Sequence, residues 1–150
     1  MAPVADLTAH AGYWLRLVSN AVSQDFARKL AAEGVTVAEW CVLRVLYDGD
    51  GLAPSALADR MGLTRGAISK LADRLLAKDL ILRLAHPRDG RAHCLSLSPA
   101  GRRRVPVLAA IADRNDADYF GALTPAEHDS LLRMLKGLAA RRGLKQVPLD

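Results

Sequence analysis

Aromatic residues are scarce in this sequence, which holds two Phe, three Tyr and two Trp among 150 residues. A core with so few rings is built mainly from Ala, Leu and Val, and this composition favours helices. No apolar run reaches the roughly 18 to 20 residues needed to span a bilayer. The first ten residues also lack the basic and apolar regions of a signal peptide. We therefore expect one cytoplasmic domain that does not enter a membrane.

Cysteine is rarer still, with only Cys41 and Cys94. They form no CxxC pair, and the four histidines are dispersed, so we expect neither a metal site nor a cofactor. Two distant free thiols fit a reducing compartment. Cys41 lies in an apolar stretch, where a buried inert thiol is the favoured interpretation and a redox sensor the alternative. We expect Cys94 to be structural too.

Enzyme motifs are also missing, because no GxGxxG, P-loop, HExxH or GxSxG pattern occurs. The sequence thus predicts a protein that is not an enzyme. One alternative stays open, a small enzyme acting on aromatic compounds with its active site among His10, Trp14 and Cys41.

Positive charge, by contrast, is concentrated in the middle of the chain. Residues 60–104 hold eleven basic and three acidic residues, a net charge of +8, whereas residues 1–59 carry −3 and residues 105–150 carry zero. A solvated charged surface is the plain explanation of any charge run. Segregation of this degree favours a face that binds a polyanion such as DNA.

Apolar periodicity and capping signals predict a mostly α fold with one β-hairpin, in the order α-α-α-α-β-β-α-α. The predicted elements are a helix from about Leu7 to Leu30, a second between Thr36 and Asp48, a short third that contains Pro54 and stops at Gly62, a fourth from Thr64 to about Lys78, strands over 81–85 and 93–97, a fifth helix from Ser98 to about Phe120 and a last helix that begins at Thr124. Capping boxes are expected at Thr36 with Glu39 and at Thr124 with Glu127.

The third and fourth helices, joined through Gly62, have the pattern of a helix-turn-helix whose second helix enters a major groove. The predicted apolar face of that helix is Ile68, Leu71, Ala72 and Leu75. Its candidate DNA-binding residues are Thr64, Arg65, Gly66, Ala67, Ser69, Lys70 and Arg74. The polar side chains donate hydrogen bonds, and the two small residues let the backbone approach closely. A helical hairpin with a solvated face is the alternative.

The predicted hairpin favours a DNA-binding helix-turn-helix over a helical hairpin with a solvated face, because a two-stranded ribbon directly after such a helix is a wing. Its tip carries Arg88, Asp89 and Arg91, and an arginine there can enter a narrow minor groove. We expect Asp89 to orient Arg91 by a charge-assisted hydrogen bond, although a turn-forming aspartate is the alternative. The same basic face would also serve a sequence-indifferent architectural DNA-binding protein.

Four segments together resemble the MarR family (multiple antibiotic resistance regulators). They are Leu57-Ala-Asp-Arg-Met-Gly-Leu-Thr64, Ile68-Ser-Lys-Leu-Ala-Asp-Arg-Leu75, Asp89-Gly-Arg91 and Leu97-Ser-Pro-Ala-Gly101. The resemblance implies a winged helix-turn-helix dimer that reads a pseudo-palindromic operator as a repressor. It also implies release by a small aromatic or phenolic ligand or by thiol oxidation. One departure is Asp79, which stands where the family has Gly in the turn after the recognition helix.

The apolar rows of the first and last helices lie at the two chain ends, where a single lobe cannot easily cover both. We therefore expect a homodimer, with residues 36–98 as the DNA-binding lobe and residues 1–35 and 99–150 as dimerisation helices. His10, Tyr13 and Trp14 share one turn of the first helix, and Trp40 could approach from the second. These four residues are candidates for an aromatic ligand pocket, with plain packing as the alternative.

Overall fold

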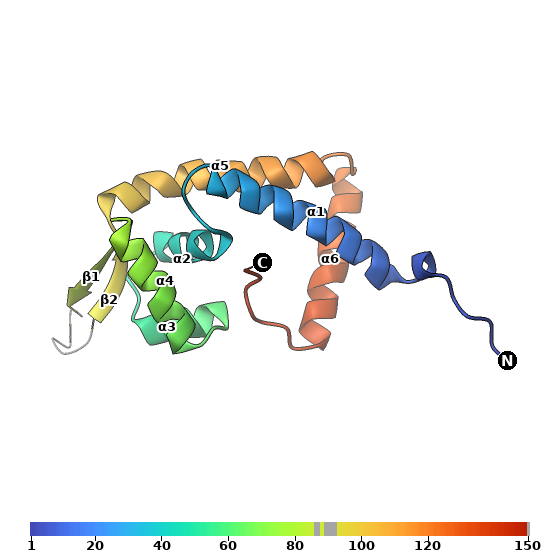
Figure 1. Cartoon of the computed structure of the whole chain (residues 1–150), viewed down its shortest axis with the longest axis horizontal. Helices are drawn as coiled ribbons and strands as arrows, with labels where there is room; N and C mark the ends of the chain where they lie inside the picture. Colours follow the sequence, from blue (N-terminus) through green and yellow to red (C-terminus); the bar gives the residue numbers. More distant parts are fainter. Residues whose placement is uncertain (86–87, 89–92, 150) are drawn as a thin grey trace.

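The computed structural model describes residues 1–85, 88 and 93–149. Within them the chain forms six α-helices, a short 3₁₀ turn and one β-hairpin (Figure 1). The elements are η1 (Leu7–Ala9), α1 (Ala11–Ala31), α2 (Val37–Tyr47), α3 (Pro54–Met61), α4 (Arg65–Ala77), β1 (Ile81–Ala85), β2 (His93–Leu97), α5 (Pro99–Phe120) and α6 (Pro125–Arg141). The predicted fold class and element order are confirmed.

The start of the first helix differs from the prediction. Residues Leu7–Ala9 form a separate 3₁₀ turn, and His10 has an extended backbone with φ −99° and ψ 127°. This break means that α1 begins at Ala11 rather than near Leu7. Apolar periodicity could not reveal the break, because it depends on the backbone angle of a single residue.

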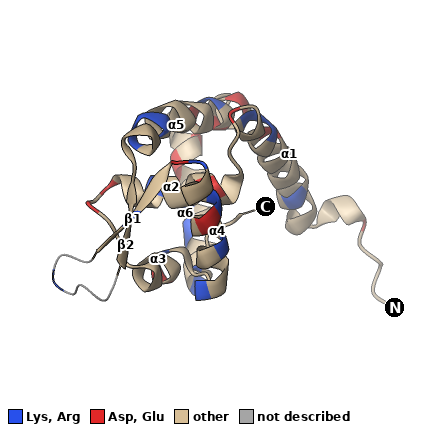
Figure 2. Cartoon of the chain, turned by 60° about the vertical axis from the view of Figure 1, so that its left-hand side comes forward, with Lys and Arg blue, Asp and Glu red and all other residues tan. Residues whose placement is uncertain are grey.

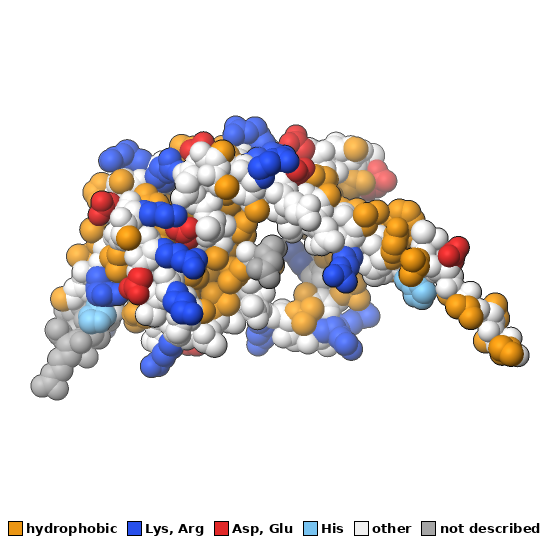
Figure 3. All heavy atoms as spheres, viewed as in Figure 1, with side chains coloured by type: hydrophobic (Ala, Val, Ile, Leu, Met, Phe, Trp, Pro, Cys, Tyr) orange, Lys and Arg blue, Asp and Glu red, His pale blue; other side chains and the backbone are white. Residues whose placement is uncertain are grey.

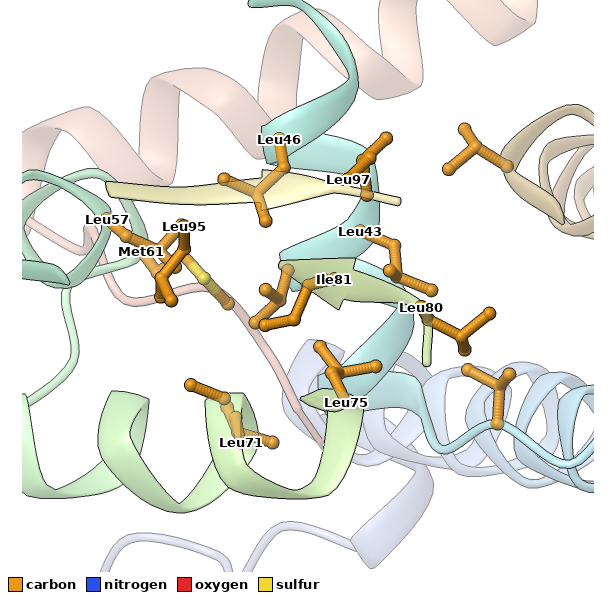
Figure 4. Close-up of a cluster of buried hydrophobic side chains, with 14 of the residues drawn as sticks. Leu43, Leu46, Leu57, Met61, Leu71, Leu75, Leu80, Ile81, Leu95 and Leu97 are labelled. Atoms are coloured by element: carbon orange, nitrogen blue, oxygen red, sulfur yellow. The ribbon is translucent and has the colours of Figure 1, made fainter. Parts of the chain in front are cut away.

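The chain forms an arch (Figure 1). One leg is a lobe made of α2, α3, α4 and the hairpin, and the other leg is α6; α1 and α5 lie side by side between them. The core is centred in the lobe, where α2, α3, α4 and β2 contribute buried leucines, together with Met61 and Ile81 (Figure 4), and it extends to Leu30 of α1 and to Val105, Leu108 and Ile111 of α5. In contrast, no residue of α6 is buried within the chain.

The hairpin is antiparallel, with Ile81 opposite Leu97 and Ala85 opposite His93. On β2, Leu95 and Leu97 are buried against the lobe, and a bridge between Leu52 and Leu95 ties the strand to the loop before α3. The base of the hairpin is thus fixed to the core that supports α4.

Side-chain caps set the helix starts where the sequence predicted them. Thr36 with Glu39 and Thr124 with Glu127 form complete capping boxes, in which each hydroxyl and each carboxylate accepts a backbone N–H hydrogen bond. Thr64 caps α4 through the N–H of Ala67, and Ser98 caps α5. These bonds need only residues three apart, which is why the sequence sufficed to predict them.

The last residues of the chain return to the lobe. The N–H of Val147 donates to the carbonyl of Met61 at 3.0 Å, and Val147 and Leu149 pack against the core. A Cβ on Gly62, at the end of α3, would lie 2.8 Å from the Cα of Gln146. The C-terminal segment 144–149 therefore rests directly on the helix-turn-helix.

Candidate nucleic-acid interface

The turn between α3 and α4 is built by Gly62 and Thr64. Gly62 adopts a left-handed backbone with φ 66° and ends α3, and Thr64 begins α4 two residues later. Leu63 closes the turn by donating its N–H to the carbonyl of Ala58 at 3.0 Å. The geometry is that of a helix-turn-helix, with α4 in the position of the recognition helix.

The recognition helix α4 buries the face that the periodicity predicted, namely Ile68, Leu71, Ala72 and Leu75. The opposite face points away from the core. Of the candidate DNA-binding residues on this helix and its cap, all are exposed except Ala67, which is half-buried; the exposed ones are Thr64, Arg65, Gly66, Ser69, Lys70 and Arg74. The fold thus brings these seven positions together on one outward surface.

The cations of this surface have no acidic partner among the described residues. Among the residues that the structure describes, Arg65, Lys70 and Arg74 form no ion pair, and Asp73 of the same helix lies 3.9 Å from Arg83 of β1. Figure 2 shows Lys and Arg along α4, and Figure 3 shows basic side chains gathered on the lobe. Three uncompensated cations on one rigid helix suit the phosphates and base edges of a DNA groove.

The candidate wing follows β1. Arg88 is exposed, while Asp89 and Arg91 lie outside the described residues, as does the hydrogen bond expected between them. Leu82 and Leu84 of β1 are also exposed, at 41% and 48%. The hairpin therefore projects beyond the core next to the recognition helix, as the sequence predicted.

The C-terminal end of α4 is fixed more firmly than the sequence suggests. Lys78 ends the helix, and Asp79 follows with φ 57°, the left-handed conformation for which the family pattern uses Gly. Ser98 donates through Oγ to the carbonyl of Asp79 at 2.7 Å and through its N–H to the carbonyl of Leu80 at 3.0 Å. The turn is thus held against the start of α5.

Lys78 also joins α4 to the loop after α1 and to α2, which sequence reasoning missed. Its ammonium donates to the carbonyl of Gly34 at 2.8 Å and to Oε1 of Glu39 at 3.0 Å. Glu39 was expected only as part of a capping box. No local pattern links two residues 39 positions apart, so nothing in the sequence pointed to this pair.

The candidate ligand residues separate into two places within one chain. Tyr13 and Trp14 pack edge to face, with ring centroids 5.3 Å apart, on the exposed first turns of α1, next to His10. Trp40 instead lies at a cavity of about 250 Å³ between α1, α2 and the C-terminal segment. The cavity is lined by Val22, Ser23, Phe26, Val37, Trp40, Cys41, Val147 and Pro148.

Both cysteines are free and half-buried. Burial raises the pKa of the Cys41 thiol, which disfavours the thiolate that oxidation requires. Within the described part of the chain, no group of three His, Cys, Asp or Glu residues is placed to hold a metal ion, and no helix is long and apolar enough to cross a membrane.

Comparison with known proteins identifies relatives across most of the chain. The model of the MarR family matches residues 33–92. A protein of Thauera aromatica, proposed to be a transcriptional regulatory protein for the hcr operon, is 35% identical over 128 residues, which cover 85% of this chain and 77% of that protein. The HTH-type transcriptional repressor MdtR of Bacillus subtilis is 30% identical over 113 residues, 75% of this chain and 73% of MdtR.

Solved structures share the fold. BpsR of Bordetella bronchiseptica, whose DNA binding is regulated by 6-hydroxynicotinic acid, superposes with a TM-score of 0.79 at 22% identity, covering 91% of this chain and 98% of that chain. A cysteine-to-serine mutant of MarR from E. coli, in complex with operator DNA, gives a TM-score of 0.75 at 22% identity, covering 85% and 91%. The relatives and structural neighbours are transcriptional regulators, not enzymes.

Proposed function

This chain belongs to the MarR family of DNA-binding transcriptional regulators, and we propose that it acts as a repressor that binds a pseudo-palindromic operator as a homodimer. The observation that carries the proposal is the outward face of α4. It presents Arg65, Lys70 and Arg74 without internal ion-pair partners among the described residues, on a helix whose other face is fixed in the core.

In the proposed complex α4 enters the major groove. Arg65, in the first turn, reads a base edge, since a bidentate arginine contact to guanine is the commonest specific contact. Thr64, Ser69 and Lys70 bind phosphates or bases, Gly66 and Ala67 allow close approach of the backbone, and Arg74 reaches a flanking phosphate. At the wing, Arg88 and Arg91 bind the minor groove, with Asp89 orienting Arg91.

The homodimer is supported by apolar surface that the single chain leaves open at both ends. On α6, Leu132, Met134 and Leu138 are 39%, 57% and 55% exposed. On α1, Trp14 and Leu15 are 51% and 53% exposed. Such faces are typical of surfaces that a second copy covers. A two-fold axis between two lobes would then match an operator with two inverted half-sites.

We propose in addition that a small phenolic or aromatic acid weakens operator binding. BpsR, regulated by 6-hydroxynicotinic acid, shows that this fold accommodates such control in that protein. The aromatic surface for this ligand comes from two separate places in one chain, the first turns of α1 with His10, Tyr13 and Trp14, and Trp40 at the cavity. In the proposed dimer these two groups would meet only where the N-terminal turns of one copy reach the other copy. Titration of operator complexes with hydroxylated aromatic acids tests this point, and the absence of any release would contradict it.

The decisive experiment selects bound duplexes from genomic fragments and then measures affinity by fluorescence anisotropy over a range of salt concentrations. Arg65→Ala should lose about 1 to 3 kcal/mol of discrimination at one base position. Lys70→Met should lower the salt slope by about one unit for each phosphate contact removed. Size-exclusion chromatography with light scattering should show a dimer for both variants.

Arg133→Ala is the matched control. Arg133 lies on the far side of α6 from the leucine row (Leu131, Leu132, Leu135 and Leu138), because a helix turns by about 100° per residue. Its substitution should leave affinity and salt slope unchanged. Full affinity in both the Arg65 and Lys70 variants would refute the proposed interface. Equal affinity of the wild type for selected and scrambled duplexes would instead indicate an architectural DNA-binding protein.

A further inference from the structure

Three elements meet at the ammonium group of Lys78, the residue that ends the recognition helix. Nζ donates to the carbonyl of Gly34, which follows α1, at 2.8 Å. It also lies 3.0 Å from Oε1 and 2.7 Å from Oε2 of Glu39 in the first turn of α2. This one side chain therefore connects the helix that faces DNA with the loop that leads out of α1.

Glu39 is the buried partner of this pair, because its side chain is only 1% exposed. Its Oε1 accepts the N–H of Thr36, and its Oε2 has no hydrogen bond of good geometry among the described residues. The charge of Lys78 is thus what compensates Oε2. Burial raises the pKa of Glu39, but hydrogen bonds from Lys78 and Thr36 outweigh it, so that the pKa lies below its ordinary value and the carboxylate is charged.

On one side of the helix end, this ion pair adds a polar link to the apolar packing of α4 on α2. On the other side, Ser98 ties the backbone of Asp79 and Leu80 to α5. Beside Lys78, a cavity is lined by Glu33, Arg103 and Arg104, and Glu33 forms its own ion pair with Arg104. The end of α4 is therefore held between α5 and the loop after α1.

A tilt of α4 about this end would be largest at the opposite end of the helix, where Arg65 lies. The helix spans 13 residues, which corresponds to roughly 20 Å at 1.5 Å per residue. A tilt of about 10° about Lys78 would displace Arg65 by roughly 3 Å. Hydrogen bonds form only over donor–acceptor distances of about 2.7 to 3.2 Å, so such a tilt would break base contacts.

We propose that Lys78 and Glu39 are positioning residues for DNA recognition, which set the angle of α4 relative to the dimerisation helices without touching DNA. The inference rests on the proposed operator binding by α4. It assigns the Glu33–Thr36 loop a role in that binding, since any shift of the end of α1 reaches the recognition helix through Lys78.

The test compares two lysines of α4 by the same substitution, in the full-length protein. Lys78→Met should weaken operator binding about tenfold, within the range seen when residues without ligand contact alter binding, and should leave the salt slope unchanged. Lys70→Met should lower the salt slope. Lys78→Arg keeps the charge and should restore most of the affinity. Each variant is also followed by thermal unfolding.

A double-mutant cycle separates positioning from direct contact. Glu39→Gln keeps an acceptor for the Thr36 N–H but removes the charge, and it should weaken binding to a similar extent. The double variant, Glu39→Gln with Lys78→Met, buries no unpaired charge, so it remains folded even if Lys78→Met alone does not. Its operator affinity should fall no further than that of Glu39→Gln alone.

Three outcomes overturn the inference. Unchanged operator affinity with a lowered melting temperature in both single variants would reduce the pair to a structural role. A lowered salt slope in Lys78→Met, additive with Glu39→Gln, would show that Lys78 contacts phosphate. Unchanged operator affinity in the double variant would show that the pair does not set the angle of α4 that operator binding requires. If the Arg65 and Lys70 variants also bind normally, it is the proposed interface that fails.

Discussion

Gly101 offers a sharp test of how the lobe is joined to α5. It lies buried in the first turn of that helix, where its N–H donates to Oγ of Ser98 at 2.9 Å. A Cβ at this position would lie 2.0 Å from the carbonyl oxygen of Leu80 and 3.0 Å from its carbonyl carbon. Both are backbone atoms at the start of the hairpin, so Gly101→Ala can be accommodated only by moving α5 away from the lobe.

The size of the effect follows from two opposing contributions. Forcing a methyl group into a packed interior costs up to about 3 kcal/mol. The same substitution gains at most about 1 kcal/mol of helix propensity. We therefore expect a net loss of about 2 kcal/mol in the free energy of unfolding, part of it from the strained hydrogen bond between Ser98 and Leu80.

Urea unfolding followed by circular dichroism measures this loss at a fixed protein concentration, because the proposed dimer would make the apparent stability depend on concentration. With a slope of about 2 kcal/mol per molar urea, the midpoint should fall by about 1 M. Gly137→Ala is the control, since a Cβ there would meet no atom within 4 Å, and it should raise the midpoint slightly. Equal midpoints for the Gly101 variant and the wild type would refute the packing argument.

Three further predictions concern the recognition helix and its supports. Gly66→Ala should leave stability equal or slightly higher, since a Cβ there meets nothing closer than 4.0 Å. Anisotropy should nevertheless show weaker operator binding, because the added methyl group would lie in the proposed DNA interface. Gly62→Ala should lower the melting temperature, because φ is 66° and the new Cβ would lie 2.8 Å from the Cα of Gln146. Removal of residues 144–150 in the same variant should relieve the clash with Gln146 but not the backbone strain at residue 62, so part of the lost melting temperature should return. No recovery of the melting temperature would contradict the docking of the C-terminal segment. The pKa of Glu39 lies below its ordinary value of 4.5, so its pairing with Lys78 adds stability above about pH 4.5 that is lost as the pH falls through the folded-state pKa. In urea unfolding at a series of pH values below about 4.5, the free energy of unfolding should therefore fall less steeply for Glu39→Gln than for the wild type. Parallel curves of free energy against pH would argue against the ion pair.

The sequence by itself determined the order of the elements and the outward face of α4. Thr36, Thr64, Ser98 and Thr124 begin helices by bonds to residues three positions on, and these bonds need no contact from elsewhere in the chain. The buried and exposed sides of α4 follow in the same way from a period of 3.6 residues. Asp79 stood out in the sequence only as a departure from the family's Gly, and it adopts the left-handed conformation that aspartate tolerates.

Only the tertiary structure decided how these pieces support one another. The pairing of Lys78 with Glu39, the crowding of Gly101 against Leu80 and the separation of Trp40 from Tyr13 all depend on how helices cross. Crossing angles are set by the volumes of many side chains packed at once, and no short segment carries that information. The chain's local chemistry thus fixes which helix carries the outward basic face, while contacts between distant residues fix how that helix is held against the rest of the chain.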